Sequence, residues 1–169
     1  FSLGEDGRLV LDELVYDPGT ETGSSAISVV QGVFTFVSGQ IAKTGPDAMT
    51  VTTPVASIGI RGTTVAGRAA AEGDTNTITL LADDTGRVGE ISISNAGGVQ
   101  VLNVANQTTQ VTSFFSSPAA PVVLAAAQVQ QLFGSAMQAR PPQPTRQDSD
   151  DEAAADQQDA EGGDAAEGE

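Results

Sequence analysis

One arginine stands in the middle of an apolar, strand-like run, "ASIGIRGTTV". The sequence has only seven lysines and arginines against 22 aspartates and glutamates, so a cation between Ile60 and Gly62 needs a reason. The five donors of a guanidinium match an anionic ligand or a partner carboxylate. Arg61 can also be a buried anchor that donates to backbone carbonyls, to Asp12 or to Glu13. We favour the buried anchor, because a cation among β-strands is usually paired internally.

Pairs of carboxylates are the one catalytic arrangement worth weighing, because a glycosidase needs two of them about 5–10 Å apart. Asp12 and Glu13 are neighbours in an expected strand, so their side chains should point to opposite faces. The remaining pairs lie in turn-like stretches, where acidic residues are ordinary turn chemistry: Asp83 with Asp84, and Glu72 with Asp74. We therefore expect no catalytic pair.

The composition excludes several classes of function. The chain contains no cysteine and no histidine, which removes thiol catalysis, Ser-His triads and the usual zinc sites. Its net charge of -15 disfavours nucleic acid and anionic membrane surfaces, which need clustered basic residues. We expect a non-enzymatic protein without cofactor or metal, whose partners are other proteins or neighbouring domains of the same chain.

Residues 1–116 have the pattern of many short β-strands separated by turns. Turns recur roughly every 8–12 residues, which predicts an all-β domain, either a sandwich or a solenoid-like fold, and disfavours alternating strands and helices. Gly32 and Gly39 end two of the runs and predict bends or bulges. The expected strands cover 8–16, 26–32, 33–39, 50–60, 63–70, 77–82, 90–95, 99–106 and 107–115.

Residues 117–139 change to a helical period. A helical stripe is formed by Val122, Ala126, Val129, Phe133 and Met137. Pro121 suits the first helical position. We predict a C-terminal helix that packs on or caps the β domain; a helix that binds a partner is the alternative.

In residues 140–169, Arg140 is followed by three prolines within four residues, and from Gln147 onward every charged residue is acidic. No aromatic and no β-branched residue follows Thr145, which predicts a disordered linker or tail. The acidic cluster 148–152 lacks the glycine turn and distal glutamate of an EF-hand loop, so calcium is only a weak alternative there. No run of about 18 apolar residues occurs, so we expect no membrane insertion within this segment.

The stretch 51–65 resembles the core signature of the FecR domain family, in which a strand and Thr-Pro lead through small or apolar residues to Ile-Arg-Gly-Thr. The stretches 29–43 and 89–95 are similar to flanking elements of that family, and Asn106–Gln107 is the nearest counterpart of its later Gly-Gln pair. The resemblance covers about residues 8–115. The signature residues, which we interpret as structural, are Thr53, Pro54, Gly59, Ile60, Arg61, Gly62 and Thr63.

The resemblance implies an extracytoplasmic β domain of bacteria, located in the periplasm, at the cell surface or outside the cell. We expect a structural or protein-interaction module of a larger exported protein. The alternative is the periplasmic sensory domain of a FecR-type transmembrane regulator that signals to an anti-sigma and sigma factor system. The sensory domain could bind another protein by strand addition at an open sheet edge. The family has no catalytic constellation to carry over.

Overall fold

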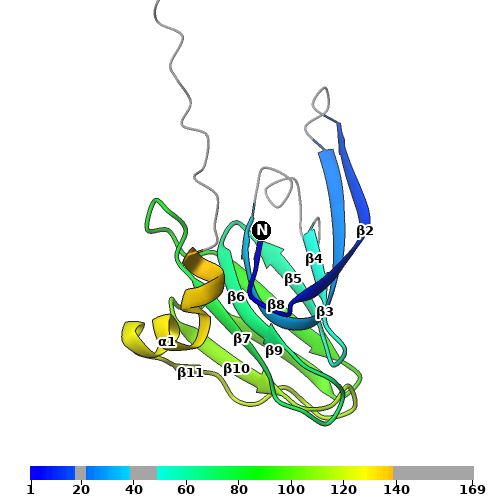
Figure 1. Cartoon of the computed structure of the whole chain (residues 1–169), viewed down its shortest axis with the longest axis vertical. Coiled ribbons are helices and arrows are strands. Elements are labelled where there is room, and N and C mark those ends of the chain that lie inside the picture. The colour runs from blue at the N-terminus through cyan, green and yellow to red at the C-terminus, as the bar shows by residue number, and fades with distance from the viewer. Residues whose placement is uncertain (18–21, 39–48, 139–169) are drawn as a thin grey trace, which may run out of the picture.

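The computed structural model describes residues 1–17, 22–38 and 49–138, with side chains omitted for 13–17, 22 and 23. Residues 140–169, which we predict to be disordered, lie outside this description. The described residues form 11 strands and one helix (Figure 1). The elements are β1 (Ser2–Leu3), β2 (Arg8–Asp17), β3 (Thr22–Val37), β4 (Met49–Thr52), β5 (Ser57–Arg61), β6 (Thr64–Ala69), β7 (Asn76–Leu81), β8 (Glu90–Asn95), β9 (Gly98–Leu102), β10 (Gln107–Val111), β11 (Val122–Val123) and α1 (Ala126–Gln138).

The strands form one continuous sheet that curls into a half-barrel (Figure 1). Their order along the sheet is β11-β10-β7-β6-β3-β4-β5-β8-β9, and β1 and β2 pair with β3 beside this path. The β3–β4 pair is parallel, and the other pairs are antiparallel. This arrangement confirms the prediction of an all-β fold of mostly short strands with a C-terminal helix.

The long strand β3 joins the two halves of the sheet. Its first part, Ser25–Ser28, pairs with β4, and its last part, Gly32–Val37, pairs with β6. Gly32 lies where the partners change, and its φ of +102° favours glycine. A Cβ there would lie 2.5 Å from the Cα of Gly7. The two strands predicted over 26–32 and 33–39 are therefore one bent strand; Gly39 lies outside the described residues.

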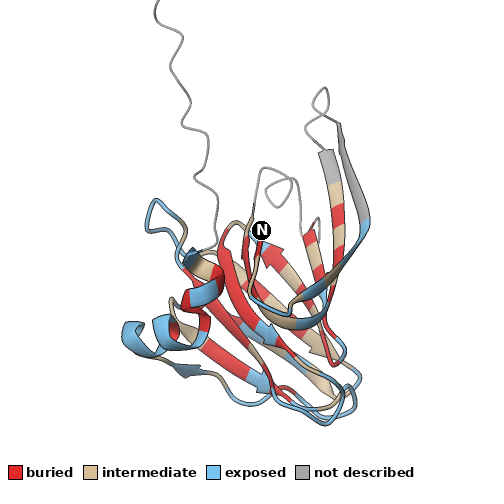
Figure 2. Ribbon diagram, viewed as in Figure 1, coloured by how far each residue is buried: buried red, intermediate tan, exposed pale blue. Residues whose placement is uncertain are grey.

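Two apolar clusters lie on opposite faces of this sheet, because Val65 and Leu80 belong to one cluster and their strand neighbours Ala66 and Leu81 to the other. Figure 2 marks the buried residues in red. We call the face inside the curl the inner face and the face under α1 the outer face. The largest fully buried side chains of the inner face include Phe34, Phe36, Ile58, Ile60, Ile78, Leu80, Ile91, Ile93 and Leu102. The buried apolar residues of the outer face are Ala66, Leu81, Val129 and Phe133.

The helix begins later than the predicted segment 117–139. Val122 was expected in the helical stripe, but it lies in β11 and pairs with Thr108 of β10. A β-branched residue such as valine suits a strand better than a helix. Val129 and Phe133 of α1 are buried in one cluster with Ala66 of β6 and Leu81 of β7. Within the described ranges, no helix has the length and apolar character needed to cross a membrane.

Candidate functional site

The first half of the FecR-like signature forms the turn between β4 and β5. The backbone N–H of Thr53 donates to the carbonyl of Ala56 at 2.8 Å. The Thr53 hydroxyl also donates to that carbonyl at 3.1 Å and accepts from the Ala56 N–H at 3.2 Å. Pro54 is exposed inside the turn, where its missing N–H and fixed φ are suitable. The strand predicted over 50–60 is therefore two strands joined by this turn.

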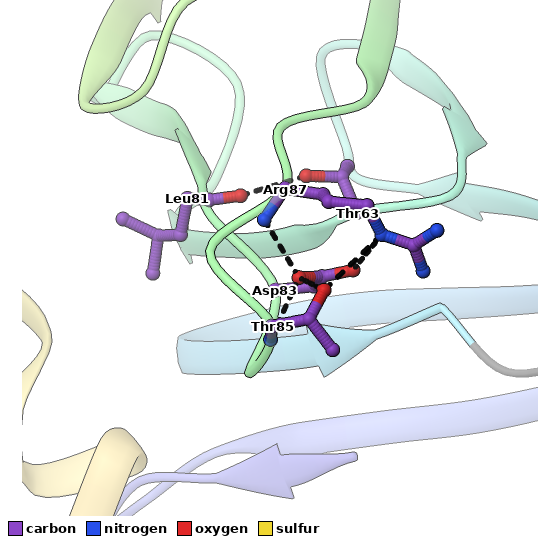
Figure 3. A network of polar contacts seen from close by, with 5 residues as sticks. All are labelled: Thr63, Leu81, Asp83, Thr85 and Arg87. Atoms are coloured by element: carbon purple, nitrogen blue, oxygen red, sulfur yellow. Dashed lines mark hydrogen bonds and ion pairs between the residues drawn. The ribbon is translucent and has the colours of Figure 1, made fainter.

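The second half of the signature takes the chain from β5 to β6. Ile60 is buried in the inner face, and Gly62 has a φ of +56°, which disfavours other residues. Thr63 is buried and its hydroxyl donates to the carbonyl of Leu81 on β7 at 2.7 Å (Figure 3). Through these contacts the signature residues shape the turn by which the chain passes from β5 to β6.

Gly89 packs so closely against the backbone of this corner that no side chain fits at its position. A Cβ at Gly89 would lie 2.0 Å from the carbonyl oxygen of Arg61 and 2.7 Å from that of Gly62. Both contacts are far shorter than van der Waals distance, so no side chain can occupy the position without moving the backbone. Gly59, earlier in the signature, lies opposite Thr50 and Ser92 in the sheet.

The prediction that Arg61 is a buried anchor is wrong. Its side chain is 54% exposed and forms an ion pair with Glu90, at 3.5 Å between Nη1 and Oε1. Side chains alternate along a strand, and because Ile60 points inward, Arg61 must point outward. Glu90 lies directly opposite on β8, so it replaces the predicted partners Asp12 and Glu13.

Three of the carboxylates weighed for catalysis, Asp12, Glu72 and Asp83, have structural contacts, and the side chain of Glu13 lies outside the description. Asp12 accepts a hydrogen bond from the hydroxyl of Ser28, at a register irregularity of β2. Glu72 accepts from the backbone N–H of Phe114, at 3.0 and 3.2 Å to its two oxygens. Within the described residues, no group of three or more acidic side chains could hold a metal ion.

Asp83 organises the loop between β7 and β8 (Figure 3). Its Oδ1 accepts from the N–H and hydroxyl of Thr85, at 2.9 and 2.6 Å, and from the N–H of Arg87 at 2.9 Å. The Thr85 hydroxyl and then the Arg87 N–H lower the pKa of Asp83 to about 2. The loop and Gly62 line a shallow pocket of about 170 Å³. A carboxylate held ionised in this way closes a loop and is unsuited to act as a general acid.

Asn95 connects three segments, and the sequence analysis did not single it out. Its Nδ2 donates to the carbonyls of Ser113 and Ser116, at 3.0 and 2.8 Å. Its Oδ1 accepts from the N–H groups of Gly97 and Gly98, at 2.9 and 3.1 Å. An asparagine directly before a glycine-containing turn is a local signal of such side chain–backbone bonding.

The edge strand β9 presents apolar side chains outward. We define the β9 edge as Gly98–Leu102; in the described part of the chain this strand pairs only with β8. Val99 is 65% exposed and Val101 is 41% exposed, whereas Leu102 is buried. The loop that carries Phe114 and Phe115 is held beside the turn into β9, because the N–H of Ala96 donates to the carbonyl of Phe114. Phe115 is itself 78% exposed.

Comparisons with known proteins show a similar fold and no family. No family model and no curated protein matches the sequence. Two crystal structures of a putative anti-sigma factor from Parabacteroides distasonis, at 1.65 and 2.50 Å resolution, each match with a TM-score of 0.50 and 14% identity. Each match covers 77% of this chain and 62% of the compared chain, so this chain matches less than two thirds of that protein. At this identity the likeness shows the fold alone.

Proposed function

We propose that this chain is a non-enzymatic, FecR-like module that binds a protein partner outside the cytoplasm, as part of a larger exported bacterial protein. The observation that carries the proposal is the open β9 edge with its exposed valines, Val99 and Val101. The structural roles of the signature residues support a scaffold, since Thr53, Gly62 and Thr63 shape turns and corners.

The β9 edge has the properties of a strand-addition site. An edge strand offers unpaired backbone groups to an incoming strand, and exposed side chains on alternate positions add specificity. Val99 and Val101 occupy such alternate positions, and Phe115 extends the apolar surface near the start of the strand. Proteins commonly protect edge strands with charged residues, whereas no residue from Gly98 to Leu102 is charged.

The test compares two exposed apolar pairs on different edge strands. Photo-cross-linking with the full chain in periplasmic and outer-membrane extracts would identify a bound protein. The variant Val99→Lys/Val101→Lys should lose that protein, and the matched control Val10→Lys/Leu11→Lys on β2 should keep it, because both change the charge equally. Loss in the control alone, or in neither variant, would refute binding at the β9 edge.

A second function is the sensory domain of a FecR-type transmembrane regulator that signals to an anti-sigma and sigma factor system. The likeness of the fold to a putative anti-sigma factor favours it. The complete gene separates the two functions. A membrane helix upstream of Phe1, preceded by a short cytoplasmic domain, supports the regulator, and tandem repeats after Glu169 support the exported module.

A further inference from the structure

A row of small hydroxyl side chains crosses the outer face of the sheet. Ser2 of β1 lies opposite Thr35 of β3, which lies opposite Ala66 of β6. Ala66 in turn lies opposite Thr79 of β7, and Thr79 lies opposite Thr108 of β10. Directly paired residues share a face, so four hydroxyls and one alanine form a continuous row across five strands.

The two ends of this row differ in hydrogen bonding. The hydroxyls of Thr79 and Thr108 bond each other at 2.8 Å. The hydroxyls of Ser2 and Thr35 are buried and have no hydrogen-bond partner among the described residues. The same holds for the hydroxyl of Thr64, which neighbours Thr35 diagonally on the same face. Thr35 is 2% exposed and Thr64 is 3% exposed. Buried hydroxyls usually have a partner, so these three require an explanation.

Thr35 and Thr64, which carry two of these hydroxyls, line a partly open cavity of about 330 Å³ between α1 and the sheet. Such a volume is within the range of small-molecule sites in proteins. Five of its ten lining residues are apolar and five have polar side chains. The lining includes Thr35, Thr64, Leu81, Val129, Gln130 and Met137.

We propose that this cavity is a binding site for a small, uncharged molecule that carries a hydroxyl or amide group on an apolar body. Each threonine hydroxyl can donate one hydrogen bond to the ligand and accept another from it. A neutral hydroxyl or amide group can therefore be the partner of both threonines. The side chains of Leu81, Val129 and Met137 contact the apolar body. This site is separate from the β9 edge and independent of the function proposed there.

The described charges around the cavity disfavour an anionic ligand. Among the described residues no lysine or arginine lines it, and the one ionisable residue of the lining is the acidic Asp84. A carboxylate or phosphate in this cavity would lose hydration without gaining a cation. The free energy lost in this way exceeds what hydrogen bonds to two neutral hydroxyls provide. A neutral ligand avoids this loss of free energy.

Three probes with the same ring and different substituents test the site: benzyl alcohol, toluene and benzoate. Each is titrated into the full chain while the methyl signals of Leu81, Val129 and Met137 are followed by nuclear magnetic resonance. Benzyl alcohol should give saturable shifts and bind about threefold to tenfold more tightly than toluene, the range expected for a net hydrogen bond. Benzoate should give none.

The variant Thr35→Val/Thr64→Val removes the two hydroxyls at nearly constant volume. It should reverse the order, so that toluene binds more tightly than benzyl alcohol. An unchanged order, or tight binding of benzoate by the unmodified chain, would overturn the proposal. If no probe shifts any of these signals, the cavity holds water only and the proposal is equally wrong.

A pair of helix variants keeps the test valid if the double threonine variant does not fold. Ala126 lines the cavity, and its neighbour Ala127 is exposed and does not. Ala126→Phe should fill the cavity and abolish benzyl alcohol binding, whereas Ala127→Phe should leave it unchanged. Equal binding by both variants would place the probe elsewhere and refute the site.

Discussion

The inner and outer faces of the sheet are built from alternate residues of the same strands, yet they differ in chemistry. In β3, Phe34 and Phe36 point into the inner core, and Thr35 between them points to the outer face under α1. The inner face is apolar throughout its buried cluster, whereas the outer face combines a small apolar cluster with hydroxyls and a cavity. The inner face therefore mainly stabilises the fold, whereas the outer face leaves space for the binding site that we propose.

The largest expected effect tests the stabilising role of the inner face. The ring of Phe34 lies against Gly67, where an added Cβ would be 2.4 Å from its Cζ. Phe34→Ala should lower the free energy of unfolding by about 3–5 kcal/mol, because it leaves a cavity in a closed core. Phe133→Ala on the outer face should cost less, because its surroundings can relax into the existing space. Chemical denaturation measures both, and a larger loss for Phe133→Ala would invert the comparison.

Two adjacent threonines sharpen the comparison at the level of single hydroxyls. Thr63→Val removes the donor to the Leu81 carbonyl and should cost about 1–3 kcal/mol, the penalty for an unsatisfied buried group. Thr64→Val removes a hydroxyl that has no hydrogen-bond partner in the described part of the chain, and it should leave stability unchanged or raise it. Thermal unfolding of the two variants gives the answer, and equal destabilisation would show that Thr64 has a bonded hydroxyl.

Two adjacent residues at the corner between β5 and β6 allow two contributions to stability to be compared: the backbone conformation of Gly62 and the exposed ion pair of Arg61. Gly62→Ala should cost about 1–2 kcal/mol, because a Cβ is disfavoured at positive φ. Arg61→Ala should cost less than about 1 kcal/mol, as expected for an exposed ion pair. Denaturation curves of both variants are the measurement; a large loss for Arg61→Ala would restore the buried anchor that the structure contradicts.

The smallest effect concerns the exposed loop at Asp83. Its folded pKa of about 2 lies below its ordinary value near 3.8, so the contribution of the ionised carboxylate is present above pH 3.8 and is lost as the pH falls toward 2. Thr85→Val removes the largest cause and should raise the pKa of Asp83 toward its ordinary value. Carbon-13 titration of the carboxyl group measures the shift. An unchanged pKa in Thr85→Val would assign it to the backbone donors instead.

The sequence predicted the class of fold because strand patterns and turn residues are local. Strands such as β7 and β8 fall close to the predicted segments, and the bend at Gly32 was marked by glycine itself. Boundaries were missed where side chain–backbone bonds decide them, as at Thr53, which divides one predicted strand into two. Val122 was wrongly assigned to the helix because an apolar residue at that position fits both the helical stripe and the short strand in which it lies.

The contacts of the site depend on pairing between distant strands and were not predictable from local pattern. Arg61 was expected to be buried, because the sequence does not reveal that Glu90 lies opposite it. The row that begins with Ser2 and Thr35 requires the register of β1 against β3, which no short motif encodes. Exposure of the β9 edge likewise depends on which strand ends the sheet.

The difference between the two faces can be measured most directly through their contact with water. Nuclear Overhauser effects from water should reach the methyl groups of Thr35 and Thr64, because a polar cavity of this size admits water. The methyl groups of Ile58 and Ile60, which are fully buried on the inner face, should show none. Water contacts at the two isoleucines, or their absence at both threonines, would contradict the account.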